Sequence, residues 1–136
     1  MRVRQWAVSA IVALAAVRAG AQPPPVALMA DTAAGRQLFE SVCARCHRLG
    51  PARDSAPQMK VVMLRLQQRF PDRDDFVRQV VQWAANPDTL ISVMPRRVRE
   101  HFGLMPAQSL PTQSLEQVAT WLWMVDPPAI GMPARR

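Results

Sequence analysis

The stretch SVCARCHRLG, residues 41–50, holds both cysteines of the 136-residue chain and one of its two histidines. Two residues separate Cys43 from Cys46, and His47 follows the second cysteine directly. On one helical turn this spacing brings the two thiols and the imidazole close together. A redox dithiol, part of a metal site, a structural disulfide and an anchor for a prosthetic group all use closely spaced cysteines. The stretch therefore predicts a chemical site, and the rest of the chain indicates which of these four kinds of site it is.

The remaining sequence has the apolar spacing of helices, and no stretch alternates convincingly with the period of two that is typical of strands. Helical stretches are predicted at residues 31–46, 58–70, 72–85, 96–102 and 114–125. Asp31 and Asp72 are predicted N-caps. Ser114 and Gln117 form a predicted capping box at the start of the last stretch. The predicted fold class is all-α, a small bundle of four to five helices joined by proline-rich loops.

Residues 1–21 have the pattern of a secretory signal peptide, in which basic residues precede a short apolar run. Arg2 and Arg4 supply the charges, and the small residues Ala19 and Ala21 predict cleavage after Ala21. The apolar run is short of the roughly 20 residues that span a bilayer, and an uncleaved membrane-anchored form is the alternative. The sequence therefore predicts export, which in bacteria means a periplasmic protein.

The rest of the chain divides into three predicted parts. Residues 22–30, QPPPVALMA, are a flexible proline-rich connector. Residues 31–126 form one domain, and residues 127–136 form a loose C-terminal tail. The formal net charge is +7, but three of the basic residues lie in the signal peptide and the others alternate with acids, as in RFPDRDDFVR. No nucleic-acid partner is predicted, because there is no long basic run.

The pattern Cys-x-x-Cys-His is the attachment pattern of c-type haem. The two thiols add to the two vinyl groups of the porphyrin, and the adjacent imidazole binds the iron. A thioredoxin-type dithiol needs a βαβ context, which a helical chain lacks, and a zinc site needs a fourth ligand better placed than the distant His101. A disulfide would close a very small loop, and it stays open as an alternative in an exported protein. The motif predicts one covalent haem on Cys43 and Cys46, with His47 as an axial iron ligand.

With this motif in place, the chain resembles the cytochrome c family, specifically the small exported bacterial cytochromes that carry one haem (class I type). The resemblance covers residues 32–126 and rests on GRQLFESVCARCH (35–47), APQM (56–59), FGLMPAQSLP (102–111) and SLEQVATWLW (114–123). It implies a small helical bundle around a largely buried haem. It also implies that Gly35 and Phe39 of the first helix contact Trp121 of the last.

A methionine as the second axial ligand would raise the potential of the iron and suit electron transfer. Met94 and Met105 each precede a proline on a loop, so the residues themselves leave both open. The resemblance implies Met105, because the family's ligand lies in the loop before the last helix, and Met94 is the alternative. Met132 lies in the tail, and His101 is a rival ligand that is expected to be exposed.

Other methionines and some polar residues have expected roles near the haem. Met59, Met63 and Met124 lie on predicted helices and are expected to fill the core. The resemblance implies that the carbonyl of Pro57 accepts a hydrogen bond from the ring of His47, with Pro51 as the second choice. Residues that could reach the haem propionates are Trp83, Arg69 and Arg97.

The function that follows is a periplasmic one-electron carrier whose haem iron cycles between the ferric and ferrous states. Such a protein is not an enzyme, has no small-molecule substrate and docks transiently with redox proteins. One alternative is a haem subunit of a larger periplasmic dehydrogenase or oxidase, with residues 88–102 as a docking surface. The other is a haem sensor or peroxidase with a labile sixth ligand.

Overall fold

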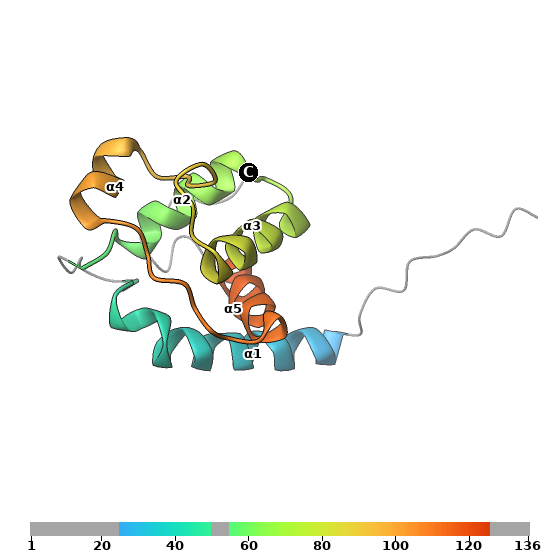
Figure 1. The fold of residues 1–136 in the computed structure, drawn as a ribbon. Coiled ribbons are helices and arrows are strands. Elements are labelled where there is room, and N and C mark those ends of the chain that lie inside the picture. The colour runs from blue at the N-terminus through green and yellow to red at the C-terminus, as the bar shows by residue number, and fades with distance from the viewer. Residues whose placement is uncertain (1–24, 50–54, 126–136) are drawn as a thin grey trace, which may run out of the picture.

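The computed structural model describes residues 25–49 and 55–125, with side chains from residue 31 onward. Within these ranges every regular element is helical (Figure 1). The elements are α1 (Pro25–Ser41), the 3-10 helix η1 (Cys43–Arg45), α2 (Met59–Arg69), α3 (Arg73–Ala85), α4 (Arg96–Phe102) and α5 (Thr112–Met124). The all-α prediction is confirmed for this part of the chain. The predicted signal peptide and tail, together with Pro51 and Met132, lie outside the described residues.

The start of the first helix differs from the prediction. α1 begins at Pro25, so residues 25–30, which were predicted to belong to a flexible connector, are helical, and Asp31 lies inside the helix rather than at its N-cap. Proline is favoured at the first helical position, because its missing N–H would have no partner there and its φ already suits a helix. The Ala, Leu and Met residues that follow have high helix propensity.

The end of the first helix also differs from the continuous helix predicted over residues 31–46. α1 stops at Ser41, and the chain tightens into η1. The hydroxyl of Ser41 donates to the carbonyls of Gln37 at 2.8 Å and of Leu38 at 3.2 Å. Such back-bonding competes with the regular helical ladder, and 3-10 turns are frequent at helix ends. The Cys-x-x-Cys-His motif therefore begins on a tight turn rather than within a helix.

Three predicted helices are confirmed with bounds within one residue, namely α2, α3 and α4. The predicted N-cap of α3 is also confirmed. The carboxylate of Asp72 accepts hydrogen bonds from the backbone N–H groups of Asp74 at 2.9 Å and Asp75 at 3.5 Å. These bonds satisfy N–H groups that have no partner within the helix.

The cap gives a direct prediction for stability. Replacing Asp72 with alanine should lower the free energy of unfolding by about 1 kcal/mol, because two N–H groups lose their acceptor and the positive end of the helix dipole loses a nearby carboxylate. Urea unfolding followed by circular dichroism measures the change. Glu116→Ala is the control, since it removes an exposed acid that no described residue pairs with. Equal stability of Asp72→Ala and the unmodified chain would contradict the capping role.

The start of the last helix does not follow the predicted capping box. α5 begins at Thr112, directly after Pro111, and no side chain caps it. Ser114 therefore lies inside the first turn, and the side chain of Gln117 points across to α1, where its amide donates to the carboxylate of Asp31 at 3.2 Å. The fixed φ of Pro111 suits the residue before a helix, so the helix starts where the proline allows it. The buried apolar residues of α5 are Leu115, Val118, Ala119 and Leu122.

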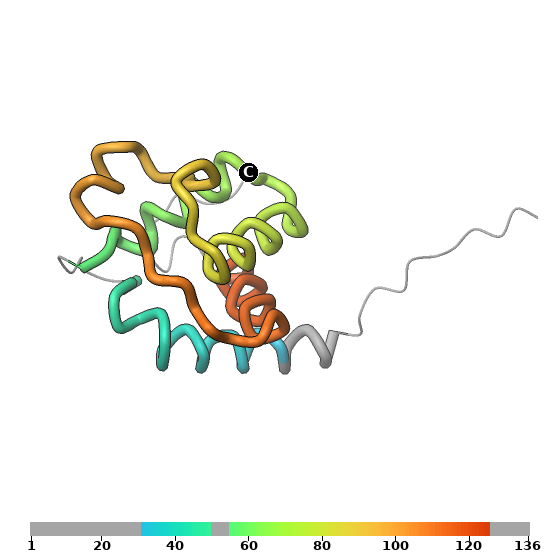
Figure 2. The backbone as a smooth tube through the Cα atoms, viewed as in Figure 1, coloured from blue at the N-terminus to red at the C-terminus, as the bar shows by residue number. Residues whose placement is uncertain are grey.

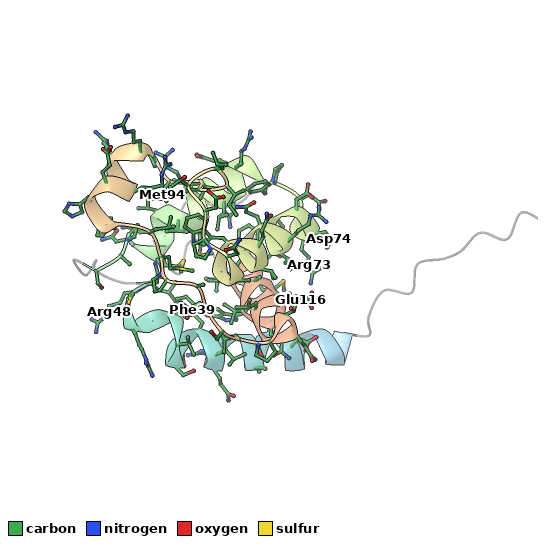
Figure 3. All side chains as sticks on the ribbon, viewed as in Figure 1. Phe39, Arg48, Arg73, Asp74, Met94 and Glu116 are labelled. Atoms are coloured by element: carbon green, nitrogen blue, oxygen red, sulfur yellow. The ribbon has the colours of Figure 1, made fainter. Side chains whose placement is uncertain are left out.

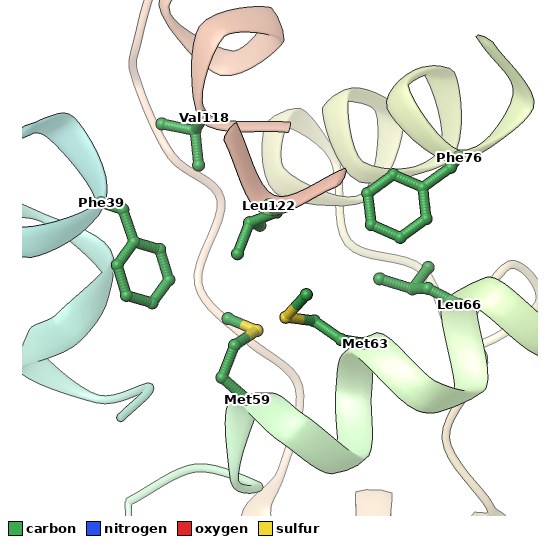
Figure 4. Close-up of a cluster of buried hydrophobic side chains, with 7 residues drawn as sticks. All are labelled: Phe39, Met59, Met63, Leu66, Phe76, Val118 and Leu122. Atoms are coloured by element: carbon green, nitrogen blue, oxygen red, sulfur yellow. The ribbon is translucent and has the colours of Figure 1, made fainter. Parts of the chain in front are cut away.

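The core lies where α1, α2, α3 and α5 meet (Figure 4). Its buried side chains are Phe39 from α1, Met59, Met63 and Leu66 from α2, Phe76 from α3, and Val118 and Leu122 from α5. The chain between α3 and α5 does not enter this core; it runs around one side of the molecule and carries α4 with it (Figure 2). None of these described helices is both long and apolar enough to cross a membrane.

The tightest contact in the bundle joins α1 to α5. A Cβ atom added to Gly35 would lie 2.1 Å from the backbone oxygen of Gln117 and 2.9 Å from the Cβ of Trp121. One turn further along α1, the ring of Phe39 packs on that of Trp121 with centroids 4.9 Å apart. The contact that the resemblance implied between the first and last helices is therefore present, and the absence of a side chain at Gly35 permits it.

Candidate functional site

The Cys-x-x-Cys-His motif lies in the turn that follows α1. The backbone carbonyl of Cys43 accepts hydrogen bonds from the N–H groups of Cys46 at 3.2 Å and His47 at 2.9 Å, so one tight turn holds all three residues. Cys43 is half-buried and Cys46 is exposed. Both are free thiols, so the alternative of a structural disulfide is not what this structure contains.

A hydrogen bond fixes the ring of His47. Its Nδ1 atom lies 3.2 Å from the carbonyl oxygen of Pro57, an acceptor, so the proton on Nδ1 points to that carbonyl. The backbone N–H of Met59 donates to the carbonyl of Arg48 at 3.1 Å and ties the start of α2 to the same turn. The pairing of His47 with Pro57 is the one that the resemblance implied. It leaves Nε2 with its lone pair, and Nε2 makes no hydrogen bond to any other described residue.

Burial shifts two acid–base equilibria in the motif. It lowers the pKa of His47, and the hydrogen bond to Pro57 opposes this shift without cancelling it. It also raises the pKa of the Cys43 thiol. A neutral imidazole is the form that binds a metal. A raised thiol pKa is the opposite of what activates a reactive dithiol, in which the attacking cysteine has a lowered pKa.

The lowered pKa of His47 predicts a pH dependence of stability in the haem-free chain. The unfolded chain binds a proton at the ordinary pKa of 6.5, whereas the folded chain binds it only at lower pH. Stability is therefore full above about pH 6.5 and declines as the pH falls through the folded-state pKa.

Urea midpoints measured between about pH 8 and pH 4 would show this decline. Carboxylates also titrate toward the acid end of that range, so the control is His47→Gln, in which the part of the decline that belongs to the imidazole should vanish. An identical pH profile for the two chains would contradict the assignment.

The candidate methionine ligands lie on the segment between α3 and α5. Met94 and Met105 are both half-buried. Met94 is held at both backbone ends, because its N–H donates to the hydroxyl of Ser92 at 3.2 Å and its carbonyl accepts from Arg99 at 2.6 Å. Figure 3 labels Met94 on the segment between α3 and α5 and Arg48 just beyond η1.

The loop that carries Met105 follows α4 and is anchored on its far side. Gly103 ends α4 with a φ of 75°, a backbone angle that glycine adopts without strain. Beyond Met105, the N–H of Gln108 donates to the carbonyl of Ala84 at the end of α3, at 2.8 Å. The loop therefore crosses from α4 to α3 with fixed ends and a half-buried thioether between them.

The other methionines and His101 differ in how exposed their side chains are. Met59 and Met63 are buried, as predicted for core residues. Met124 is 53% exposed, so its predicted core role is wrong. Met124 lies in the last turn of α5, two residues after the buried Leu122. Residues two apart lie on nearly opposite sides of a helix, so Met124 faces away from the core. His101 is exposed on α4, as expected.

The residues considered for propionate binding come from three different helices. Trp83 is half-buried on α3, Arg69 is exposed at the end of α2, and Arg97 is exposed on α4. No hydrogen bond joins any of these side chains to another described residue. A contact between any of them and a propionate therefore stays a prediction.

A feature that sequence reasoning missed is the incomplete burial of a long segment. No residue from 81 to 114 is fully buried, although all of them are described. The half-buried apolar side chains of this segment include Val81, Ile91, Val93, Val98, Phe102, Met105 and Leu110. The sequence signal was the irregular spacing of apolar residues among prolines, which suits no helix stripe and no strand. Apart from Val93, which packs against the core, these side chains lie outside the hydrophobic core cluster.

The candidate donors are a pair of thiols and an oriented imidazole in one turn, and two thioethers on the segment between α3 and α5. Among the described residues, no group of three or more His, Cys, Asp and Glu side chains is close enough to hold a metal ion. An iron held by a porphyrin needs fewer protein ligands, because the porphyrin supplies four nitrogens and only the axial positions need side chains. Comparison of the chain with protein-family models, with curated proteins and with solved structures found no match.

Proposed function

We propose that the protein is an exported c-type cytochrome with one haem, which carries single electrons between redox proteins of the periplasm. The observation that carries the proposal is the hydrogen bond from the ring of His47 to the carbonyl of Pro57, made within a turn that also holds Cys43 and Cys46. A ligating histidine usually has its second ring nitrogen fixed in this way. A redox dithiol would use a charged imidazole to lower the pKa of its thiol, whereas here the pKa of Cys43 is raised and that of His47 is lowered.

The residues present fit a covalently attached haem. Cys43 and Cys46 are reduced and share one turn, so both are available to form thioethers. His47 is half-buried and is kept neutral by a lowered pKa, so Nε2 can bind iron. When bound, the haem supplies an iron that accepts and donates one electron. The protein's part is to hold the imidazole still, since an axial ligand that moves with each electron would slow the transfer.

The segment from 81 to 114 supports a large apolar group beside the motif. Except for Val93, its half-buried apolar side chains are not packed against the core, and a porphyrin face would remove them from water. Each end of the segment is held by α3 or α5, and Gln108 is bonded to Ala84 across it. A fixed frame with an uncovered apolar lining is the arrangement that a buried prosthetic group needs.

Met105 is the proposed sixth ligand, and Met94 is the alternative. Both thioethers are half-buried, but only Met105 lies on the loop directly before α5. Thioether ligation raises the potential and closes the iron to exogenous ligands, which suits a carrier rather than a sensor or a peroxidase. The resemblance to cytochromes c favours Met105 over Met94, and so does its position on the loop directly before α5.

The ligand assignment is tested on the exported protein by optical spectra and a redox titration. Met105→Ala should remove the absorption band between methionine sulfur and ferric iron. It should also lower the potential by on the order of 0.1 V, a modest part of the roughly 0.8 V that axial ligands span. Met94→Ala is the matched control and should keep both properties. Survival of the band in Met105→Ala with its loss in Met94→Ala would reassign the ligand, and its survival in both would overturn methionine ligation.

A second candidate is a haem subunit of a larger periplasmic oxidoreductase, and the position of α4 favours it. Among the described elements, α4 packs closely against no other helix. It presents Arg96 and Arg97 as exposed side chains, and Arg96 is paired only with Glu100 of the same helix. Co-purification of a larger enzyme from the periplasm would favour this role over that of a free carrier.

A further inference from the structure

A groove lies on the surface between the second half of α2 and the turn that follows α3. Its volume is about 520 Å³. One wall carries Arg65, Gln68 and Arg69, which lie on one face of α2 and are all exposed. The opposite wall is the stretch from Leu90 to Val93, and the half-buried ring of Phe70 adds apolar surface to the groove. The groove therefore combines an apolar lining with a cationic wall.

The two arginines of this wall differ from the described arginines that form ion pairs. Four arginines form ion pairs with nearby carboxylates: Arg36, Arg73, Arg78 and Arg96. Within the described residues, Arg65 and Arg69 have no carboxylate within ion-pair distance. α2 contains no acidic residue at all, so nothing on the helix itself compensates their charge. The guanidinium groups stand one helical turn apart and are free to bind carboxylates from outside.

Leu90 stands at the rim of the groove and is 89% exposed, far more than any other large apolar side chain described. The turn that carries it is well fixed. The carboxylate of Asp88 accepts from the N–H of Leu90 at 2.9 Å, and the buried amide of Gln79 donates to the carbonyl of Ile91 at 2.8 Å. An apolar side chain held in water by a rigid turn is typical of a contact residue that a partner covers.

We propose that this groove docks an acidic segment of a partner protein, whose carboxylates pair with Arg65 and Arg69 while an apolar surface of the partner covers Leu90. The positive charge of the groove favours acidic partners. An acidic segment can form ion pairs with both arginines, whereas a basic segment is repelled by them. The observations favour a protein over a lipid surface. Membrane-binding patches need clusters of about four to eight basic residues, whereas two line this groove. The carboxylate of Asp88, which accepts from the N–H of Leu90, adds a negative charge next to the groove.

The proposal does not depend on the haem and is tested on the full exported chain with a random peptide library displayed on phage. The selected peptides should be rich in Asp and Glu with at least one large apolar residue. Their affinity should fall about tenfold for the double variant Arg65→Gln/Arg69→Gln, as expected for two exposed charge contacts. Leu90→Ser should weaken binding by a similar factor. The matched control is Arg36→Gln/Arg96→Gln, which removes the same charge outside the groove and should change affinity less than twofold.

Several results would overturn the proposal. One is a selection that returns no acidic peptides. A second is an equal loss of affinity in the groove variant and in the control, which would indicate non-specific attraction. A third is binding to vesicles of anionic phospholipid that the groove variant abolishes while no peptide competes. A fourth is displacement of the peptides by millimolar succinate, which would make the site one for small organic anions.

Discussion

Replacing Gly35 with alanine should destabilise the fold by at least about 2 kcal/mol. In an ordinary helix this change is favourable by up to about 1 kcal/mol, because alanine has the higher helix propensity. Here the new methyl group would lie 2.1 Å from the backbone oxygen of Gln117. A backbone oxygen cannot rotate away as a side chain can, so α1 and α5 must move apart. Their separation would loosen the contact between Phe39 and Trp121 as well.

Thermal and urea unfolding of the purified protein measure this effect. Gln37→Ala is the matched control, because it places alanine at an exposed position of the same helix. The control should unfold within about 0.5 kcal/mol of the unmodified protein. An unchanged or increased stability of Gly35→Ala would show that the two helices do not approach each other as closely as described.

Replacing both cysteines, Cys43→Ala and Cys46→Ala together, should abolish covalent haem attachment completely. The chain has no other cysteine, so no other thiol can form a thioether. Each single variant should retain at most one bond to the porphyrin. The imidazole of His47 would remain, and any haem held by it alone should be lost under denaturing conditions.

Intact-mass measurement of the exported variants tests this expectation. The unmodified protein should be heavier than its polypeptide by the mass of one haem, and the double variant should show the polypeptide mass alone. The control is Arg45→Ala, which changes the residue between the cysteines and should keep the haem. A haem adduct on the double variant would place the attachment elsewhere.

The central helices of this fold could be predicted from the sequence because their signals are local. α3 begins with a capping aspartate, Asp72, and ends at Asn86 and Pro87, and each of these acts on its immediate neighbours. The errors occurred where two local signals compete. Asp31 and Ser114 both look like N-caps, yet Pro25 and Pro111 lie further upstream and the helices start there. A cap predicts a helix start only when nothing before it can be helical.

Part of the candidate site was equally predictable, because the spacing of Cys43, Cys46 and His47 places them on one turn whatever surrounds them. The contact between His47 and Pro57 was expected only from the resemblance, since it joins residues on either side of a loop. The burial of single methionines was less predictable. Met63 and Met124 have the same side chain on similar helices, and their exposure depends on which turn faces the core. The groove at Arg65 and Arg69 needed the tertiary structure, because its two walls are distant in sequence.

The most direct test of the account is an extraction of the purified exported protein with acidified acetone. This solvent breaks the axial bonds to iron and removes haem that is not covalently attached, but it leaves thioethers intact. The red pigment should stay with the precipitated polypeptide. After proteolysis, a peptide containing Cys43 and Cys46 should carry it. Pigment that passes into the solvent, or a protein that never contains any, would contradict the proposal that this turn anchors a haem.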